Sequence, residues 1–447
     1  MDSHLIDSRI FGHQWATPES REIFAEKSRV ARWLEVIVAL AQAQSDCGII
    51  PAASAQAIER LRDTELPIEE IASRTRETSH STLGMIQVLR GMLPDDAAEH
   101  VYYGTTVQDV TDTSQVLEMR AVGSLLWRDW RQIEAKLLDL AAEHRSTPMA
   151  GRTHGQPGAP ITFGFKVASW ADEIGRHLTR LREARPRWMV GQLGGAVGTL
   201  AFFGDRALPL RKTLCHRLGL SEPDISWLSA RDRLAEFAHL VAMGVSSLAR
   251  IANEVYTLQR REIGELAERA GPSTVGSITM PHKRNPEVSE QIVTLARLVR
   301  AQACVLTDTM VQEHERDGRG WKAEWVVLPE LCHMALAASS MAKELLTGLE
   351  VDAQAMCRNL GSSSSSEHVL SLMSVRVGKH RAQALLQDAY RRAREQQQPL
   401  SDVLKGVATQ SELASLLDID LGAAGLMIDR VLDAARRRRA AEGEAWA

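Results

Sequence analysis

The chain is poor in cysteine, and its few cysteines show no structural pattern. The five cysteines are scattered, odd in number and without a Cys-X-X-Cys pair: Cys47, Cys215, Cys304, Cys332 and Cys357. Such usage is typical of a reducing compartment and gives no signal for a zinc site. We therefore expect a cytoplasmic protein that holds no metal.

Long apolar runs and strong charge imbalance are also missing. No run approaches the roughly 20 apolar residues of a membrane span. The N-terminal MDSHLIDSRI lacks the apolar core of a signal peptide. The net charge is −4, and the basic run at residues 436–439 continues a helical pattern, as a solvated helix end does. We expect neither a membrane nor a nucleic acid as partner.

Strand signals are rare, and helical spacing of apolar residues dominates the chain. Five stretches show it: residues 17–48, 111–144, 161–184, 231–268 and 286–315. Lengths of about 25–38 residues exceed the usual ~11–12. In the first stretch, Thr17 is the expected N-cap and Gly48 the expected end. The sequence predicts an all-α fold with a rod-like bundle, whose apolar faces meet each other and partner subunits.

A length of 447 residues is enough for two to four domains, and an apolar content of 44% is enough for a real core. We expect an N-terminal helical domain over residues 1–108, a central long-helix bundle over 109–351 and a C-terminal helical domain over 352–447. The five-serine run in GSSSSSEHV is interpreted as a turn that caps the next helix.

Three polar segments lie at the ends of the long helices. They read YYGTTVQDVTDT (residues 102–113), GRTHGQPGAP (151–160) and GSITMPHKRNPE (276–287). Glycine and proline permit tight, nonhelical backbone at such places. Taken alone, the basic, serine-headed third segment is equally consistent with an active-site lid and with a helix-capping loop.

The three segments together resemble the signature motifs of the aspartase/fumarase superfamily, in order and spacing, across nearly the whole chain. The resemblance implies a three-domain all-α fold whose central bundle forms the core of a tetramer. It also implies anti β-elimination, or the reverse addition, on a carboxylic acid. A base removes the proton next to a carboxylate, donors stabilise the dianion, and an acid protonates the leaving group. The substrate's own carboxylate is the electron sink, so no cofactor is expected.

By this resemblance Ser277 is the base, acting as an alkoxide. A serine hydroxyl needs a strongly cationic, dehydrated setting for that role. Lys283 and the loop amides could supply it once the loop closes, so the loop is interpreted as a lid that carries its own base.

His154 is the expected general acid, because imidazole can carry a proton near neutral pH. Glu290 matches the position that orients this histidine. Taken alone, His154 would more often be a buried structural histidine. His80, in ETSHSTLGM, resembles a histidine of the adenylosuccinate lyase branch that positions the substrate or shares the acid role. A purely structural role beside a helix cap is nearly as consistent with the position of His80.

The resemblance also supplies a substrate-binding set of hydroxyl, amide and ammonium groups. The residues with such groups are Thr106, Gln156, Lys283 and Asn285, and the set also includes Met280. Two positions depart from the family pattern, because Val107 and Ile278 stand where serine is common. Losing one donor to a buried carboxylate is worth ~1–3 kcal/mol.

Two branches of the superfamily compete. The segment QEHERDGRGWKAEWVVLPEL (residues 312–331) resembles 3-carboxy-cis,cis-muconate cycloisomerase. Adenylosuccinate lyases read more like SHSSVER there, with groups for a nucleotide phosphate, whereas this chain has Gly318, Trp321 and Trp325. We therefore expect a cycloisomerase-like enzyme, with a carbon–nitrogen lyase that releases fumarate from an N-succinyl compound as the alternative. A noncatalytic relative or a helical scaffold agrees less well with the intact motifs.

The spacing of two motifs predicts shared active sites. Thr106 precedes the expected helix over residues 111–144 and His154 follows it. About 34 helical residues separate the helix ends by roughly 50 Å. No proline interrupts this stretch, and Gly123 alone is a weak breaker. One chain cannot bring both motifs to one small acid, so we expect a homo-oligomer, a tetramer, with sites shared between chains.

Overall fold

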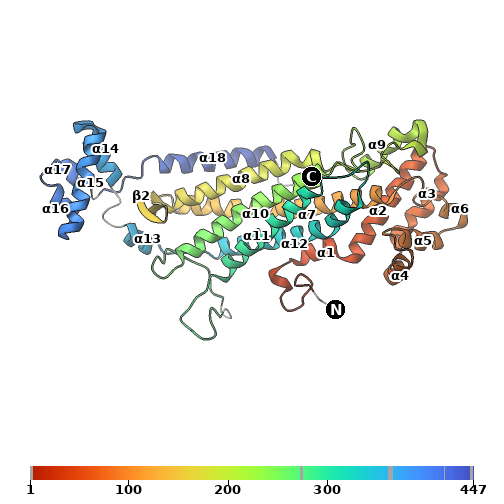
Figure 1. The fold of residues 1–447 in the computed structure, drawn as a ribbon, viewed down its shortest axis with the longest axis horizontal. Coiled ribbons are helices and arrows are strands. Elements are labelled where there is room, and N and C mark those ends of the chain that lie inside the picture. The colour runs from red at the N-terminus through yellow and green to blue at the C-terminus, as the bar shows by residue number, and fades with distance from the viewer. Residues whose placement is uncertain (1–3, 272–274, 361–365, 417, 443–445, 447) are drawn as a thin grey trace.

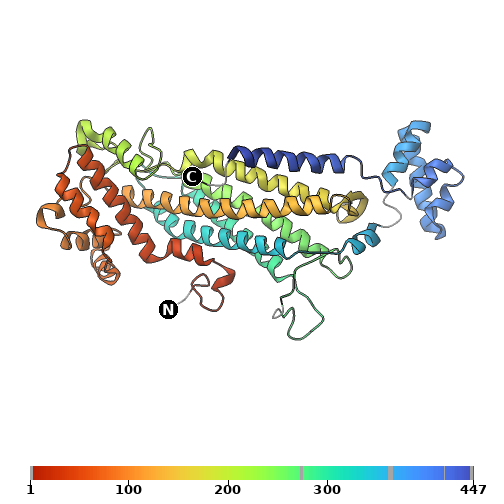
Figure 2. The same ribbon diagram turned by 180° about the vertical axis from the view of Figure 1, so that it is seen from behind.

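The computed structural model describes residues 4–271, 275–360, 366–416, 418–442 and 446. Eighteen α-helices and four short strands occur in these ranges, so the predicted all-α fold is confirmed. The molecule is a rod (Figure 1). The helices α3 to α6 lie at one end of it, and α14 to α17 lie at the other, as the reverse view also shows (Figure 2).

Five long helices form the central bundle. They are α7 (Val107–Glu143), α8 (Phe163–Trp188), α10 (Asp232–Leu258), α11 (Glu287–Asp308) and α12 (Gly318–Thr347). Large apolar side chains fill the space between them, and Trp130, Phe163 and Phe237 are fully buried. Each such burial contributes about 1.5–3 kcal/mol, so the bundle holds most of the hydrophobic core.

The helix predicted over residues 17–48 is two helices, and the single-helix prediction is wrong. The helix α1 (Pro18–Phe24) ends where Ala25 has a ψ of 144°, and α2 (Glu26–Asp46) begins directly after it. Thr17 is the predicted N-cap, since its hydroxyl accepts from the Ser20 amide at 3.0 Å. The two predicted helices over 231–268 and 286–315 end early, at Leu258 and Asp308.

The N-terminal end of the rod consists of short helices around α2. They are α3 (Ala52–Glu59), α4 (Ile68–Thr78), α5 (Leu83–Gly91) and α6 (Asp95–Ala98). The helix α9 (Ala207–Arg217) also packs against α2. These elements surround the start of α7 (Figure 1).

Two small antiparallel sheets lie at the other end of the bundle. The strands β1 (Pro148–Thr153) and β2 (Gln156–Thr162) form a hairpin directly after α7. Its turn residues His154 and Gly155 have φ of 52° and 76°, a left-handed pair that suits a two-residue hairpin turn. The strands β3 (Leu266–Ala267) and β4 (Glu350–Val351) form the second sheet.

The C-terminal helices α14 (Ser366–Val377), α15 (Lys379–Gln396), α16 (Leu400–Leu404) and α17 (Gln410–Ala414) enclose a hydrophobic core of their own. The helix α13 (Ala353–Leu360) contacts β1, and α18 (Ala424–Glu442) returns to pack along α8. The proposed boundaries of the three domains stay a prediction. Four of the five serines, 362–365, lie outside the described residues, and Ser366 begins α14.

A buried charge cluster joins α7, α10 and α12. Arg231 forms salt bridges with Asp112 and Glu324, and all three side chains are fully buried. The Arg231 guanidinium donates to both carboxylates, so none of these charges is left unpaired in the core.

The helices α10 and α12 are long and apolar enough to cross a membrane, but 67% and 61% of their most apolar windows are buried in the bundle. Such burial is typical of core helices in a soluble protein. Within the described residues, no cluster of three or more His, Cys, Asp or Glu side chains could hold a metal ion.

Candidate active site

The first predicted motif forms the rigid start of α7. The Thr106 amide donates to the Asp109 carboxylate at 3.0 Å. The same carboxylate accepts from the amides of Gly194 and Gly195 at 2.7 and 3.1 Å. Burial raises the pKa of Asp109 to about 6, although these amides and the Thr105 hydroxyl lower it. Thr106 is therefore held in place by a buried hub of hydrogen bonds.

Two further groups approach Thr106 that the sequence reasoning did not assign. Arg316 donates to the Thr106 hydroxyl at 2.8 Å. Tyr102 has a positive φ of 62°, and the Thr82 and Thr106 side chains near its hydroxyl lower its pKa. Burial raises the pKa of Tyr102, so its phenol stays neutral and can donate. A guanidinium, a phenol and a hydroxyl together form a donor set that suits a carboxylate.

Val107 and His80 lie at the same end of the rod. Val107 is the first residue of α7 and offers no side-chain donor. The Nδ1 atom of His80 accepts from the Leu83 amide at 3.2 Å, so this exposed histidine caps α5. Thr82, two residues on, lies near the Tyr102 hydroxyl and brings the segment beside the first motif. A substrate role for His80 stays a prediction.

The second motif lies on the β1–β2 hairpin. His154 and Gln156 are exposed at its turn, and the His154 ring has no hydrogen bond within the described residues. Arg152 anchors the hairpin through two hydrogen bonds to the buried Glu265 carboxylate, at 2.5 and 2.8 Å. The Asn359 amide donates to the same carboxylate at 2.9 Å. His154 is thus presented to solvent on an anchored support, not buried as a structural histidine would be.

The third motif is a loop that folds back on itself between α10 and α11. The Ser277 hydroxyl accepts from the Met280 amide at 3.1 Å, and the Lys283 amide donates to the Met280 carbonyl at 2.9 Å. A Cβ on Gly276 would lie 2.4 Å from the Lys283 carbonyl oxygen, so only glycine permits this close approach. The loop therefore places the Ser277 backbone beside Lys283.

A cavity of about 1310 Å³ lies behind this loop. Lys283, Asn285 and Glu290 line it, so the structure brings these three predicted residues together. Arg284 donates to the Glu268 carbonyl at 2.6 Å and fastens the base of the loop. Ser277 is half-buried and Met280 is 42% exposed, and neither lines the cavity. No hydrogen bond joins Glu290 to His154 within the described chain.

The three motifs lie at two ends of one rod. The helix α7 runs without interruption for 37 residues between Thr106 and the hairpin that carries His154. At 1.5 Å per residue its ends are about 55 Å apart. The start of α7 lies near α5, whereas β2 and α13 lie at the far end (Figure 1). A single chain therefore does not unite Thr106 with His154.

Two tryptophans occupy the segment after Arg316. The Trp321 indole donates to Asp112 at 3.1 Å, and its ring centroid is 4.8 Å from that of Trp325. Gly318 begins α12, capped by Asp317, whose carboxylate accepts from the Arg319 amide at 2.9 Å. The two indoles offer neither a hydroxyl nor a cation to a phosphate.

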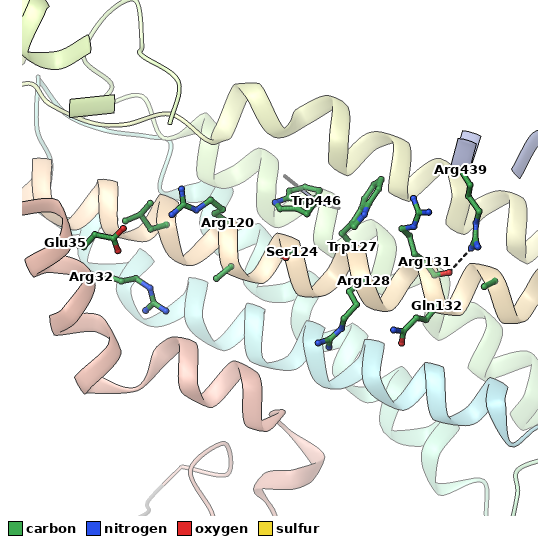
Figure 3. A pocket seen from close by; sticks show the side chains of 13 residues that line it. Arg32, Glu35, Arg120, Ser124, Trp127, Arg128, Arg131, Gln132, Arg439 and Trp446 are labelled. Carbon is green, nitrogen blue, oxygen red and sulfur yellow. Dashed lines mark hydrogen bonds between the residues drawn. The ribbon is translucent and has the colours of Figure 1, made fainter. Parts of the chain in front are cut away.

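A separate groove on the side of the bundle is rich in arginine (Figure 3). Its cations are already engaged, and it contains none of the predicted site residues. The contacts are Arg32 with Glu118, Arg120 with the Leu218 carbonyl, Arg128 with Glu19, Arg131 with Glu442 and Arg439 with Glu134. We interpret this groove as a packed, charge-balanced side of the rod.

Comparison with known proteins agrees with this arrangement. A family model described as a lyase matches residues 13–301. The chain is 38% identical over 444 residues to N-acetyl-S-(2-succino)cysteine lyase of Dickeya dadantii, covering 97% of this chain and 98% of that protein. It is 37% identical over 446 residues to 3-carboxy-cis,cis-muconate cycloisomerase of Pseudomonas aeruginosa, covering 96% and 97%. It is 33% identical over 454 residues to adenylosuccinate lyase of Methanocaldococcus jannaschii, covering 98% and 97%.

Solved structures show the same fold. The 3-carboxy-cis,cis-muconate lactonizing enzyme from Pseudomonas putida matches with a TM-score of 0.88 and 33% identity, over 96% of this chain and 99% of that one. A fumarate lyase from Mesorhizobium sp. BNC1 matches with a TM-score of 0.87 and 34% identity, over 94% and 98%. The chain therefore belongs to the lyase family and is an enzyme of the aspartase/fumarase superfamily.

Proposed function

We propose that the enzyme releases fumarate from a 2-substituted succinate whose leaving group is a thiol. The observation that carries the carboxylate part is the donor set at the start of α7, in which Arg316 and Tyr102 converge on the Thr106 hydroxyl. The thiol is suggested by two relatives named N-acetyl-S-(2-succino)cysteine lyase, at 38% and 36% identity. This replaces our first expectation, a cycloisomerase, as the preferred reaction.

The chemistry balances without a cofactor. The Ser277 alkoxide takes the proton from the carbon next to one carboxylate, and the freed electron pair forms the double bond of fumarate. The bond between the neighbouring carbon and sulfur breaks, and sulfur leaves with the electron pair. His154 then protonates the thiolate. A thiol with a pKa of about 8.5 is a good leaving group, so it needs little help from an acid.

The positions of the motifs imply that each site is built from more than one chain. Arg316 and Thr106 would bind a carboxylate at one end of their own rod. Lys283, Asn285 and Ser277 would come from the loop of a chain packed antiparallel to it. We propose a homotetramer with shared sites, in line with the superfamily.

The segment around Trp321 supports exclusion of nucleotides. A phosphate needs cations and hydroxyls, whereas Trp321 is turned into the core toward Asp112 and packs edge-to-face on Trp325. An N-succinyl nucleotide would therefore bind poorly, which disfavours the adenylosuccinate lyase alternative. The cycloisomerase stays a second candidate, favoured by the resemblance of residues 312–331.

A substrate panel tests the proposal. The purified enzyme is assayed with N-acetyl-S-(2-succino)cysteine, 3-carboxy-cis,cis-muconate and adenylosuccinate, each followed by ultraviolet absorbance of the unsaturated acid. We expect the largest kcat/KM for the thioether and the smallest for the nucleotide. If the largest kcat/KM is that of the muconate, the cycloisomerase reaction becomes the preferred one. Ready turnover of adenylosuccinate would refute the proposal that the segment of Trp321 and Trp325 excludes nucleotides.

A further inference from the structure

A small polar slot lies between α2, α7 and α12, apart from the three motifs. Its volume is about 80 Å³, and a water molecule in the liquid occupies about 30 Å³. The slot therefore has the volume of fewer than three water molecules, so it admits a small group and not a ring system. Its lining is Arg29, Trp33, Thr111, Ser114, Gln115, Glu118, Trp325 and Pro329.

Three buried polar atoms of the lining have no hydrogen-bond partner within the described chain. They are the Ser114 hydroxyl, the Gln115 carbonyl oxygen and the Trp325 indole nitrogen. Ser114 is 1% exposed and Gln115 is 7% exposed. An unpaired buried polar group costs about 1–3 kcal/mol, and three on one small slot indicate that something else pairs with them.

A proline adds an acceptor to the same wall. Pro329 lies inside α12 and has no amide hydrogen, so it cannot donate to the carbonyl of Trp325, four residues before it. That carbonyl is left without its helical donor beside the slot. The ring of Pro329 and the indole of Trp33 provide apolar walls.

The unpaired groups complement a secondary amide. The Trp325 indole N–H is a donor for an amide carbonyl. The Gln115 oxygen is an acceptor for an amide N–H, and the Ser114 hydroxyl can serve either role. The apolar walls suit the methyl of a short acyl group. An acetamido group has only four bonded heavy atoms, so it is one of the few groups small enough to be considered for this slot.

The slot is in reach of the carboxylate donors at the start of α7. The helices α7 and α12 run in parallel, with Thr106 beside Arg316, Asp112 beside Trp321 and Trp130 beside Ser339. Thr111 lies about 7.5 Å along the axis from Thr106 and Gln115 about 14 Å. Side chains on a helix lean toward its N-terminus, which brings the Gln115 amide closer to Thr106.

The charge near the slot disfavours an ammonium group. Arg29 and Arg32 approach the buried Glu118 carboxylate at 3.9 and 3.8 Å. On the lining of the slot, Glu118 is already paired with Arg29, so it is not free to pair with an ammonium group. A free amine, which is protonated at neutral pH, would lose its hydration there without gaining a free carboxylate, whereas its neutral N-acyl derivative would not.

We propose that this slot binds the N-acyl group of the leaving thiol, so that the enzyme selects N-acylated thiol adducts of succinate over free amino ones. The proposal rests on the proposed function. In an N-acylated cysteine adduct, five bonds of about 1.5 Å join the succinyl carboxylate carbon to the amide nitrogen, a span of at most about 7.5 Å. A carboxylate at Thr106 therefore places the amide level with Thr111, and the Gln115 side chain reaches back toward it along the helix.

The test compares two substrates that differ only in the acyl group, N-acetyl-S-(2-succino)cysteine and S-(2-succino)cysteine. The readout is the ratio of their kcat/KM values for fumarate release. Gln115→Leu removes the acceptor, and Trp325→Phe removes the donor and keeps an aromatic ring. Gln132→Leu is the matched control, because Gln132 is exposed on the same helix.

Wild-type enzyme should prefer the acetylated substrate about tenfold or more, and each slot variant should lower that preference about tenfold, as expected for one lost hydrogen bond. The control should keep the wild-type ratio. Equal losses for both substrates in Gln115→Leu and Trp325→Phe would mean that the slot is merely structural, and would overturn the proposal.

A binding experiment tests the slot independently of the proposed reaction. If wild-type enzyme releases fumarate from neither adduct, the proposed function fails, and the slot is tested by calorimetry with N-acetylcysteine and cysteine. Binding of N-acetylcysteine alone, weakened about tenfold in Gln115→Leu, would support an N-acyl site. No binding to wild type, or equal binding of both thiols, would overturn it.

Discussion

At Ser277 a weakly acidic hydroxyl is proposed to act as a base. An alkoxide is favoured only where cations and amide donors surround it and water is excluded. The hydroxyl already accepts from the Met280 amide, and the fold of the loop keeps Lys283 close. Ile278, next to Ser277, is 95% exposed, so the loop has an apolar residue available to cover the site when it closes.

Ser277→Ala should abolish turnover and leave the fold intact. The side chain is half-buried and makes one described hydrogen bond, so its loss costs little stability. Removal of a base should lower kcat by on the order of 10²–10⁴ or more. Steady-state kinetics and circular dichroism of the purified variant check this. A variant that keeps more than a tenth of the wild-type rate would show that another group is the base.

Val107→Ser should change substrate preference more than stability. A serine is well tolerated in the first turn of a helix, and its hydroxyl would join Thr106 and Arg316 as a donor. The kcat/KM of substrates with an extra carboxylate at that subsite should rise about tenfold, as expected for one restored hydrogen bond. The measurement is the ratio of kcat/KM across a panel of di- and tricarboxylates. Identical ratios in variant and wild type would contradict the role given to this position.

The site could be predicted in part from local sequence. The segment of Ser277, Lys283 and Asn285 is continuous, and its composition points to a basic loop. Arg316 escaped prediction because its bond to the Thr106 hydroxyl joins residues 210 positions apart, which only the parallel packing of α7 and α12 makes neighbours. Tyr102 is four residues from Thr106, but only its positive φ in the folded chain shows how its side chain is placed there.

Among the elements, the β1–β2 hairpin depends on one ion pair. Arg152 is 16% exposed and Glu265 is fully buried, and the two share two hydrogen bonds. The pair fixes the hairpin that presents His154 to the end of the bundle.

Arg152→Ala should lower both stability and kcat. Removal of one partner leaves a buried carboxylate uncompensated, at a cost of about 3–5 kcal/mol. The misplaced His154 should lower kcat more than it raises KM. Arg145→Ala is the control, since Arg145 pairs with Asp429 on the surface, where solvent screens such pairs and they contribute little to stability. Chemical denaturation and kinetics report both effects, and equal behaviour of the two variants would refute the anchoring role.

Helix prediction succeeded where the apolar pattern is uninterrupted and failed where tertiary contacts determine where a helix begins, breaks or ends. The stretch over 111–144 corresponds closely to α7. The break at Ala25 has no sequence signal, because alanine is a strong helix former. The helix α12 is not among the predicted stretches. It contains Gly320 and Pro329, and it packs against α7, α10 and α11.

At the scale of the whole molecule, the length of α7 determines how a site can form. The proposed carboxylate donors lie at its start, the hairpin lies about 55 Å away at its other end, and the loop follows the end of α10. A small dicarboxylic acid cannot bridge that distance. Antiparallel association of rods solves the problem, because it brings the start of one chain beside the far end of another. The central claim is therefore that the active site is shared between chains.

Complementation between two inactive variants tests this claim most directly. Arg316→Ala removes a donor at the start of α7, and Ser277→Ala removes the proposed base on the loop between α10 and α11. The two proteins are mixed in equal amounts, dissociated and reassociated, and mixed oligomers are verified by native mass spectrometry. If the residues come from different chains, about a quarter of the sites should contain both, and about that share of wild-type activity should return. Mixed oligomers that stay inactive would mean that both residues act from one chain, and would contradict the shared site.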